Sequence, residues 1–151
     1  MKILVADDNA VSLRVMEMSL HDLNHELLPA KDGEEAYKLL MASDGPRIAI
    51  IDNMMPNMTG FEVCRKLRKL EQRKGGWRRA YVIIASCSTG KEEIVEALDA
   101  GASDYVIKPY SRVELQARLR VAVRTVEFEI KLQEQIEMLT EMVRERFQPP
   151  H

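Results

Sequence analysis

Residues 48–52 read Ile-Ala-Ile-Ile-Asp, four apolar residues followed by a carboxylate. A short segment that is apolar at every position is typical of a central strand in a parallel sheet, because both of its faces are covered. Similar runs occur at 3–6 and 81–85. Shorter or weaker candidates lie at 105–107 and at 26–30, where an internal proline favours a sheet edge. The sequence therefore predicts five strands.

Amphipathic segments separate these strands. Apolar residues recur at helical spacing, and capping residues or glycines mark the segment ends. In the first of these segments two sets of apolar residues, Val11/Val15/Met18 and Leu13/Met16/Leu20, share the spacing. Helices are predicted over 11–20, from 33 to about 43, over 60–70, over 92–100 and from 111 onward. Five strands alternating with five helices predict an α/β fold, a doubly wound parallel sheet with helices on both faces.

Polar side chains follow four of the predicted strands. Asp7 and Asp8 come after the first strand, Asp52 ends the third, Ser86 follows the fourth and Lys108 follows the fifth. Sites in such folds lie beyond the carboxyl ends of the strands. We therefore expect these five side chains to meet at one edge of the sheet.

The residue types indicate the chemistry of that edge. Three carboxylates repel one another, and an all-oxygen ligand set favours Mg²⁺ over Zn²⁺. A lysine and a hydroxyl are superfluous for metal binding alone, but both can contact the oxygens of a phosphoryl group. One aspartate could then act as a nucleophile and form an acyl phosphate.

Four segments together resemble the receiver domain of bacterial response regulators, the CheY-like module of two-component signalling. They are Asp7-Asp8, residues 52–60 (DNMMPNMTG), Ser86 and residues 101–109 (GASDYVIKP). The resemblance runs in order from residue 1 to about 121. It implies a flavodoxin-like five-stranded sheet of order 2-1-3-4-5, and a signalling module that assists its own phosphorylation and dephosphorylation without being a turnover enzyme.

The resemblance also implies roles for the acidic residues. Asp52 would accept a phosphoryl group from the phosphohistidine of a sensor histidine kinase or a phosphotransfer protein. Asp8 would bind Mg²⁺ directly and Asp7 chiefly through water. Asp52 and the backbone carbonyl of Met54 would complete the protein ligands.

Three further residues would respond to the phosphoryl group. Lys108 would pair with it, Ser86 would be the switch hydroxyl, and Tyr105 would be the aromatic residue whose rotamer follows Ser86. Ser86 stands where threonine is commoner in the family, and it keeps the hydroxyl. Pro109 would follow a cis peptide bond.

The last predicted helix continues well past the end of a receiver. It runs from 111 to about 147 without glycine or proline, and an apolar stripe of Leu132, Ile136, Leu139 and Val143 has no domain to cover it. We expect residues 122–147 to form a homodimeric, parallel coiled coil. A partly frayed linker helix is the alternative. Residues 148–151, Gln-Pro-Pro-His, are predicted to be a disordered tail.

Composition and the lengths of the apolar runs indicate which partners and which cellular location to expect. The formal net charge of −2 argues against direct nucleic-acid binding. Two cysteines form no metal-ligand spacing, no signal peptide precedes the first strand, and no apolar run is long enough to span a membrane, so a cytoplasmic protein is expected.

Two functional alternatives stay open. One is a regulatory fragment of a larger enzyme, such as a diguanylate cyclase or a protein phosphatase, and the other is a phosphorylation-independent dimerisation scaffold.

Overall fold

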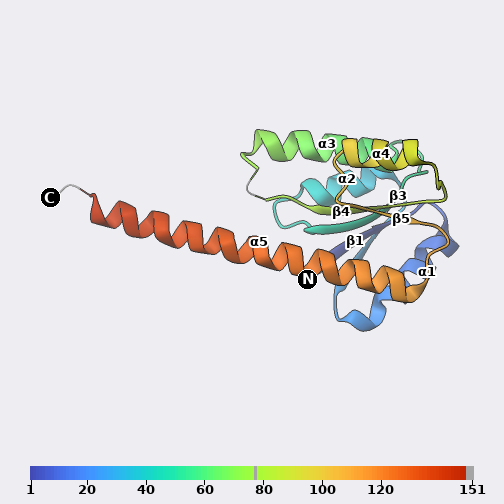
Figure 1. Cartoon of the computed structure of the whole chain (residues 1–151), viewed down its shortest axis with the longest axis horizontal. Helices are drawn as coiled ribbons and strands as arrows, with labels where there is room; N and C mark the ends of the chain where they lie inside the picture. The colour runs from blue at the N-terminus through green and yellow to red at the C-terminus, as the bar shows by residue number, and fades with distance from the viewer. Residues whose placement is uncertain (77, 149–151) are drawn as a thin grey trace.

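Five parallel strands form one sheet in the order β2-β1-β3-β4-β5, and helices cover both of its faces (Figure 1). The computed structural model describes residues 1–76 and 78–148. The strands are β1 (Lys2–Ala6), β2 (Glu26–Ala30), β3 (Ile48–Asp52), β4 (Tyr81–Ser86) and β5 (Asp104–Ile107). The helices are α1 (Ala10–Leu20), the 3₁₀ helix η1 (His21–Leu23), α2 (Gly33–Met41), α3 (Gly60–Arg73), α4 (Lys91–Asp99) and α5 (Arg112–Arg146). The predicted fold class and strand order are confirmed.

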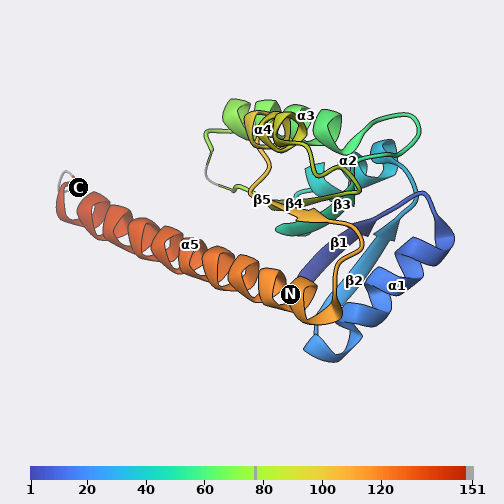
Figure 2. The same ribbon diagram turned by 45° about the vertical axis from the view of Figure 1, so that its right-hand side comes forward.

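The sheet separates two hydrophobic cores. One core joins the sheet to α2, α3 and α4, and the other joins it to α1 and α5, which lie together on the opposite face (Figures 1 and 2). Every residue of β3 is buried, as expected for a central strand covered on both sides. The proline-containing strand β2 lies at the sheet edge, where a missing backbone donor is tolerated.

Side-chain caps fix where four of the helices begin. In each case the residue before the helix accepts a hydrogen bond from a backbone N–H in the first turn, which would otherwise lack a partner. The caps are Asn9 for α1, Asp32 for α2, Thr59 for α3 and Ser111 for α5. The caps of α1, α3 and α5 end the loops that follow β1, β3 and β5, and these three loops line the candidate site.

Helix α1 buries only one of its two apolar stripes. Leu13, Met16 and Leu20 pack in the core, whereas Val11, Val15 and Met18 are exposed. Both stripes have helical spacing, so the spacing predicts the helix correctly without selecting the buried face. That face is selected by the partner, since α1 packs beside α5 on the sheet.

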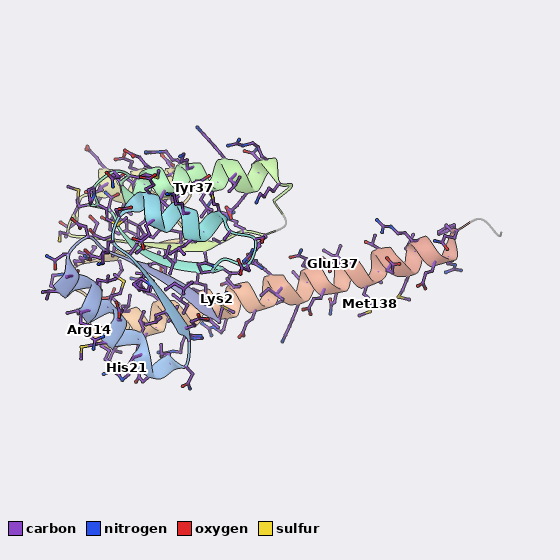
Figure 3. All side chains as sticks on the ribbon, turned by 180° about the vertical axis from the view of Figure 1, so that it is seen from behind. Lys2, Arg14, His21, Tyr37, Glu137 and Met138 are labelled. Carbon is purple, nitrogen blue, oxygen red and sulfur yellow. The ribbon has the colours of Figure 1, made fainter. Side chains whose placement is uncertain are left out.

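Helix α5 covers the sheet with its first half and then extends away from it. Leu115, Leu119, Ala122 and Val126 are fully buried. An ion pair between Arg47 and Glu129, at 3.6 Å, joins the helix to the start of β3 near the point where α5 leaves the sheet. Beyond it, side chains such as those labelled Glu137 and Met138 project from an isolated helix (Figure 3).

None of the helices in the described ranges combines the length and apolarity that a membrane span requires. Of the predicted tail at 148–151, only Gln148 lies within the described residues.

Candidate functional site

The loops at the carboxyl ends of the strands surround an open cavity of about 600 Å³. Its walls come from the segments that follow β1, β3, β4 and β5, which the parallel pairing brings to one edge. The lining includes Asp7, Asp8, Asp52, Met54, Ser86 and Lys108. Residues separated by up to a hundred positions in the chain thus meet at the edge predicted from the sequence.

Three carboxylates form a cluster in this cavity. Oxygen atoms of Asp7, Asp8 and Asp52 all lie within 4.8 Å of one another. Asp7 and Asp52 are buried, with 1% and 7% of their surface exposed, whereas Asp8 is exposed to solvent. An all-oxygen donor set of this charge and spacing fits a hard divalent cation such as Mg²⁺.

Lys108 lies between the two buried carboxylates. Its Nζ is 2.8 Å from Oδ2 of Asp7 and 2.9 Å from Oδ1 of Asp52. Ser12 donates a hydrogen bond from Oγ to Oδ2 of Asp7 and accepts one from Lys108. The Asn9 amide donates to Oδ1 of Asp7, so both oxygens of Asp7 are engaged. Among the described residues, no donor bonds Oδ2 of Asp52, which leaves one oxygen of that carboxylate available in the cavity.

The two buried aspartates differ in acidity. Burial acts to raise the pKa of Asp7, but hydrogen bonds from Lys108, Ser12 and the Asn9 amide outweigh it, and the pKa is lowered. For Asp52, burial dominates and raises the pKa although Lys108 opposes the shift. Burial would lower the pKa of Lys108, but its hydrogen bonds to Asp7 and Asp52 raise it. Lys108 therefore stays protonated at neutral pH.

The opposite wall of the cavity carries the hydroxyl of Ser86. Its Oγ donates a hydrogen bond to Oε1 of Glu93 in the first turn of α4, at 3.1 Å. Tyr105 is buried, and its hydroxyl donates to the backbone carbonyl of Ser88 at 2.9 Å. The end of β4 is thus bonded to α4, and the loop that follows it is bonded to β5. The Lys108–Pro109 peptide bond is cis, as the resemblance implied.

Comparison with known proteins settles which family has this arrangement. The sequence model of the response regulator receiver domain matches residues 3–120. The chain is a member of this family. Residues 3–120 are accordingly a signalling module of the two-component type and not a turnover enzyme.

Similar proteins agree with this assignment. The chain is 38% identical over 122 residues to the transcriptional regulatory protein KdpE of Mycobacterium tuberculosis, covering 81% of this chain and 50% of that protein. It is 34% identical over 126 residues to the probable transcriptional regulator ycf27 of Porphyridium aerugineum, covering 83% and 49%. The solved receiver domain of the Francisella response regulator 1452 superposes with a TM-score of 0.72 at 31% identity, covering 82% and 97%. The chain spans about half the length of the curated relatives it matches.

Two polar residues of this receiver pocket were missed by the sequence analysis. Ser12 bonds both Asp7 and Lys108, and Glu93 bonds Ser86. Each lies in the first turn of a helix that starts close after a strand end, and that position is the only signal the sequence offers. A polar side chain in a first turn is more often solvated or capping, so the sequence alone could not select these two.

We expect Lys108→Met to destabilise the receiver fold by about 3 kcal/mol at neutral pH, because two buried carboxylates then face each other without a cation. The pKa of Asp7 in the folded state lies below its unfolded value, so its contribution to stability is present above about pH 4 and is lost on acidification. The difference in free energy of unfolding between Lys108→Met and wild type should therefore shrink as the pH falls. Urea unfolding at a series of pH values from about 7 down to about 2 measures this, because the loss falls below about pH 4. A gap that stays constant would show that packing, not charge, accounts for the loss.

Proposed function

We propose that this chain is the phosphoacceptor of a two-component system and that Asp52 receives the phosphoryl group. The observation that carries the proposal is the state of the Asp52 carboxylate. It lies buried at the end of the central strand, Lys108 binds Oδ1, and Oδ2 is left available beside Asp7 and Asp8. A carboxylate held in this way can act as a nucleophile towards phosphorus.

The donor is a phosphohistidine on a sensor histidine kinase or a phosphotransfer protein. An oxygen of Asp52 forms a bond to phosphorus, the phosphorus–nitrogen bond of the donor breaks, and its electron pair returns to the imidazole, which takes up a proton. Lys108 then pairs with an oxygen of the new acyl phosphate. Ser86 donates its hydroxyl to another of these oxygens, and Tyr105 follows the movement of the loop after β4.

The cation site supports the same chemistry. We propose that Asp8 and Asp52 bind Mg²⁺ directly, Asp7 chiefly through water, and that the backbone carbonyl of Met54 completes the protein ligands. Bound Mg²⁺ would neutralise the charge of the carboxylates and of the phosphoryl oxygens. Met54 is part of the cavity lining, which supports a ligand role for its backbone carbonyl.

Removing one ligand tests the metal site. Wild type should gain about 1.4 kcal/mol in free energy of unfolding at a Mg²⁺ concentration ten times the dissociation constant. Asp8→Asn should lose most of this gain, because it removes an exposed carboxylate without disturbing Asp7 or Lys108. The matched control is Asp44→Asn, which removes an exposed carboxylate elsewhere. Equal Mg²⁺ stabilisation in all three proteins would place the cation outside this pocket.

The assay for the whole proposal is direct. The purified chain is incubated with Mg²⁺ and a small phosphodonor such as phosphoramidate, and its intact mass is measured over time. We expect one phosphoryl group per chain, formed only with Mg²⁺ present. No adduct with a donor that phosphorylates a known receiver under the same conditions would overturn the proposal.

We further propose that residues 1–121 act as the receiver and that, within 122–147, the part of α5 beyond Glu129 pairs with a second copy as a parallel coiled coil, since Ala122 and Val126 are buried on the sheet. Leu132 and Leu139 fall at heptad position d, and Ile136 and Val143 fall at position a. Between 43% and 61% of each of these side chains is exposed. β-Branched residues at a with leucine at d favour two parallel strands.

Charge does not oppose pairing between identical helices. The positions that flank this seam, e and g, hold Gln133, Gln135, Thr140 and Met142, none of which is charged. In a parallel pair, Met142 of one helix would lie near Phe147 of the other, which extends the apolar contact. Phosphorylation would then act by shifting the pairing or the register of these helices, a population shift between two packed states.

A further inference from the structure

Glu93 connects the first turn of α4 to the ends of two strands. Its Oε1 accepts a hydrogen bond from Ser86 Oγ at 3.1 Å and another from Asn53 Nδ2 at 3.4 Å. Asn53 is buried, and its own carbonyl oxygen accepts from the Phe61 amide, so the side chain is held in place from the other side. One carboxylate oxygen of α4 is therefore tied to β3 and β4 at the rim of the pocket.

Helix α4 has few other anchors. The residue before it, Gly90, offers no side-chain cap, and of its residues only Ala97 is buried. Its other contacts include Ile94, which packs partly buried on the core, and Glu96, which pairs with Arg65 of α3 at 3.2 Å on the surface. A helix with so little buried surface depends more than its neighbours on individual polar contacts. The two hydrogen bonds to Glu93 are therefore among the main contacts that hold the first turn of α4 in place.

The hydroxyl of Ser86 can serve only one acceptor at a time. It has a single proton, which it donates to Glu93, while its oxygen accepts a hydrogen bond from the Ser88 amide. A phosphoryl group on Asp52 needs the same proton for one of its oxygens. The bond from Ser86 to Glu93 and the bond from Ser86 to phosphate therefore exclude each other.

Charge acts in the same direction. The cavity already contains Asp7, Asp8 and Asp52, and Glu93 is part of its lining. A phosphoryl group adds negative charge beside Glu93, and two unpaired like charges in a partly buried site repel each other. A phosphoryl group in the pocket thus weakens the hydrogen bond between Ser86 and Glu93 in two ways. It takes the proton of Ser86, and it repels the carboxylate of Glu93.

We propose that Glu93 is a positioning residue that keeps Ser86 and the first turn of α4 in the resting arrangement, and that phosphorylation releases both. The proposal rests on the assignment of Asp52 as phosphoacceptor. It adds Glu93, a residue outside the acid–lysine–hydroxyl set, as the group that Ser86 leaves when it turns to the phosphoryl group. Glu93 acts through Ser86 and does not touch the reacting atoms.

The test is the affinity of the full chain for beryllofluoride, a stable analogue of the phosphoryl group, measured with Mg²⁺ by NMR titration. Glu93→Ala should bind about five to ten times more tightly than wild type, because the resting state loses one hydrogen bond to a charged group. Without beryllofluoride, its α4 amide signals should already lie part of the way towards their bound positions. The matched control is Glu92→Ala, which removes an exposed carboxylate from the same turn and should leave the affinity unchanged.

Two more variants show whether a gain in affinity comes from losing the hydrogen bond, from losing the charge of Glu93 or from a general destabilisation of α4. Glu93→Gln keeps an oxygen acceptor for Ser86, so its gain should be clearly smaller than that of Glu93→Ala. In a Ser86→Ala background, Glu93→Ala should gain clearly less affinity than it does with Ser86 present, since the hydrogen bond has already been lost and only the charge contribution remains. Equal gains for Gln and Ala, or a gain that is the same with and without Ser86, would overturn the competition.

The outcome for wild type distinguishes failure of this proposal from failure of the phosphoacceptor assignment of Asp52, on which it rests. If wild type binds beryllofluoride and Glu93→Ala binds no more tightly, the role of Glu93 is wrong and the phosphoacceptor assignment stands. If wild type itself binds none, the phosphoacceptor assignment fails and the role of Glu93 fails with it.

Discussion

Replacing Asp52 with asparagine is expected to reduce phosphoryl uptake from a small phosphodonor by at least about 100-fold, to the background of the assay. The amide keeps the shape of the side chain but is a poor nucleophile. It also gives Lys108 a neutral acceptor in place of one of its two carboxylates. The measurement is intact mass against time, with wild type and Asp44→Asn as references.

The stability of Asp52→Asn shows whether this variant is folded. The pKa of Asp52 is raised by burial, so ionising this carboxylate costs stability at every pH above its folded-state pKa, and the cost disappears as the pH falls below the unfolded value. Asp52→Asn should therefore be more stable than wild type at neutral pH, with the difference vanishing near pH 3. A stable Asp52→Asn protein that still takes up phosphate at the wild-type rate would show that another residue is the acceptor.

The second large effect is expected on the extended half of α5. Leu132→Glu combined with Leu139→Glu should convert a dimer into a monomer, weakening association more than about 1,000-fold. Two leucines per chain, four in the dimer, lose burial at roughly 1.5 kcal/mol or more each, and four carboxylates enter the seam. Light-scattering mass over a range of protein concentrations measures the change.

A matched control is available on the same stretch of helix. Met138, which is labelled in Figure 3, is 62% exposed. It falls at heptad position c, away from the seam, so Met138→Glu should leave the mass unchanged. Helix content by circular dichroism should fall in the double variant alone, because an unpaired helix frays.

Wild type examined with and without Mg²⁺ and beryllofluoride completes the experiment. A mass change that Asp52→Asn abolishes would couple the pocket to helix pairing. A dimer in every condition would mean that the signal travels through helix register. A monomer in every condition would contradict the coiled coil and leave the receiver alone.

The sequence was sufficient for the fold and for the main groups of the pocket. Four-residue apolar runs such as Ile48–Ile51 need cover on both faces, and a parallel sheet between two layers of helices provides it. Once the strands are parallel, residues that directly follow them must meet at one edge. Asp7, Asp52 and Lys108 could therefore be placed together although a hundred residues separate the first from the last.

Tertiary structure decided what periodicity leaves undetermined. Helical spacing in α1 marks two stripes, and only contact with α5 determines that Leu13 is buried and Val15 is exposed. The bond from Ser86 to Glu93 depends on where α4 lies above the ends of the strands. Side-chain hydrogen bonds act over about 3 Å, so they are fixed by the final approach of whole elements and not by the order of residues along the chain. For this reason the pattern of the chain determined the site, while the contacts proposed to switch it became visible only in the folded molecule.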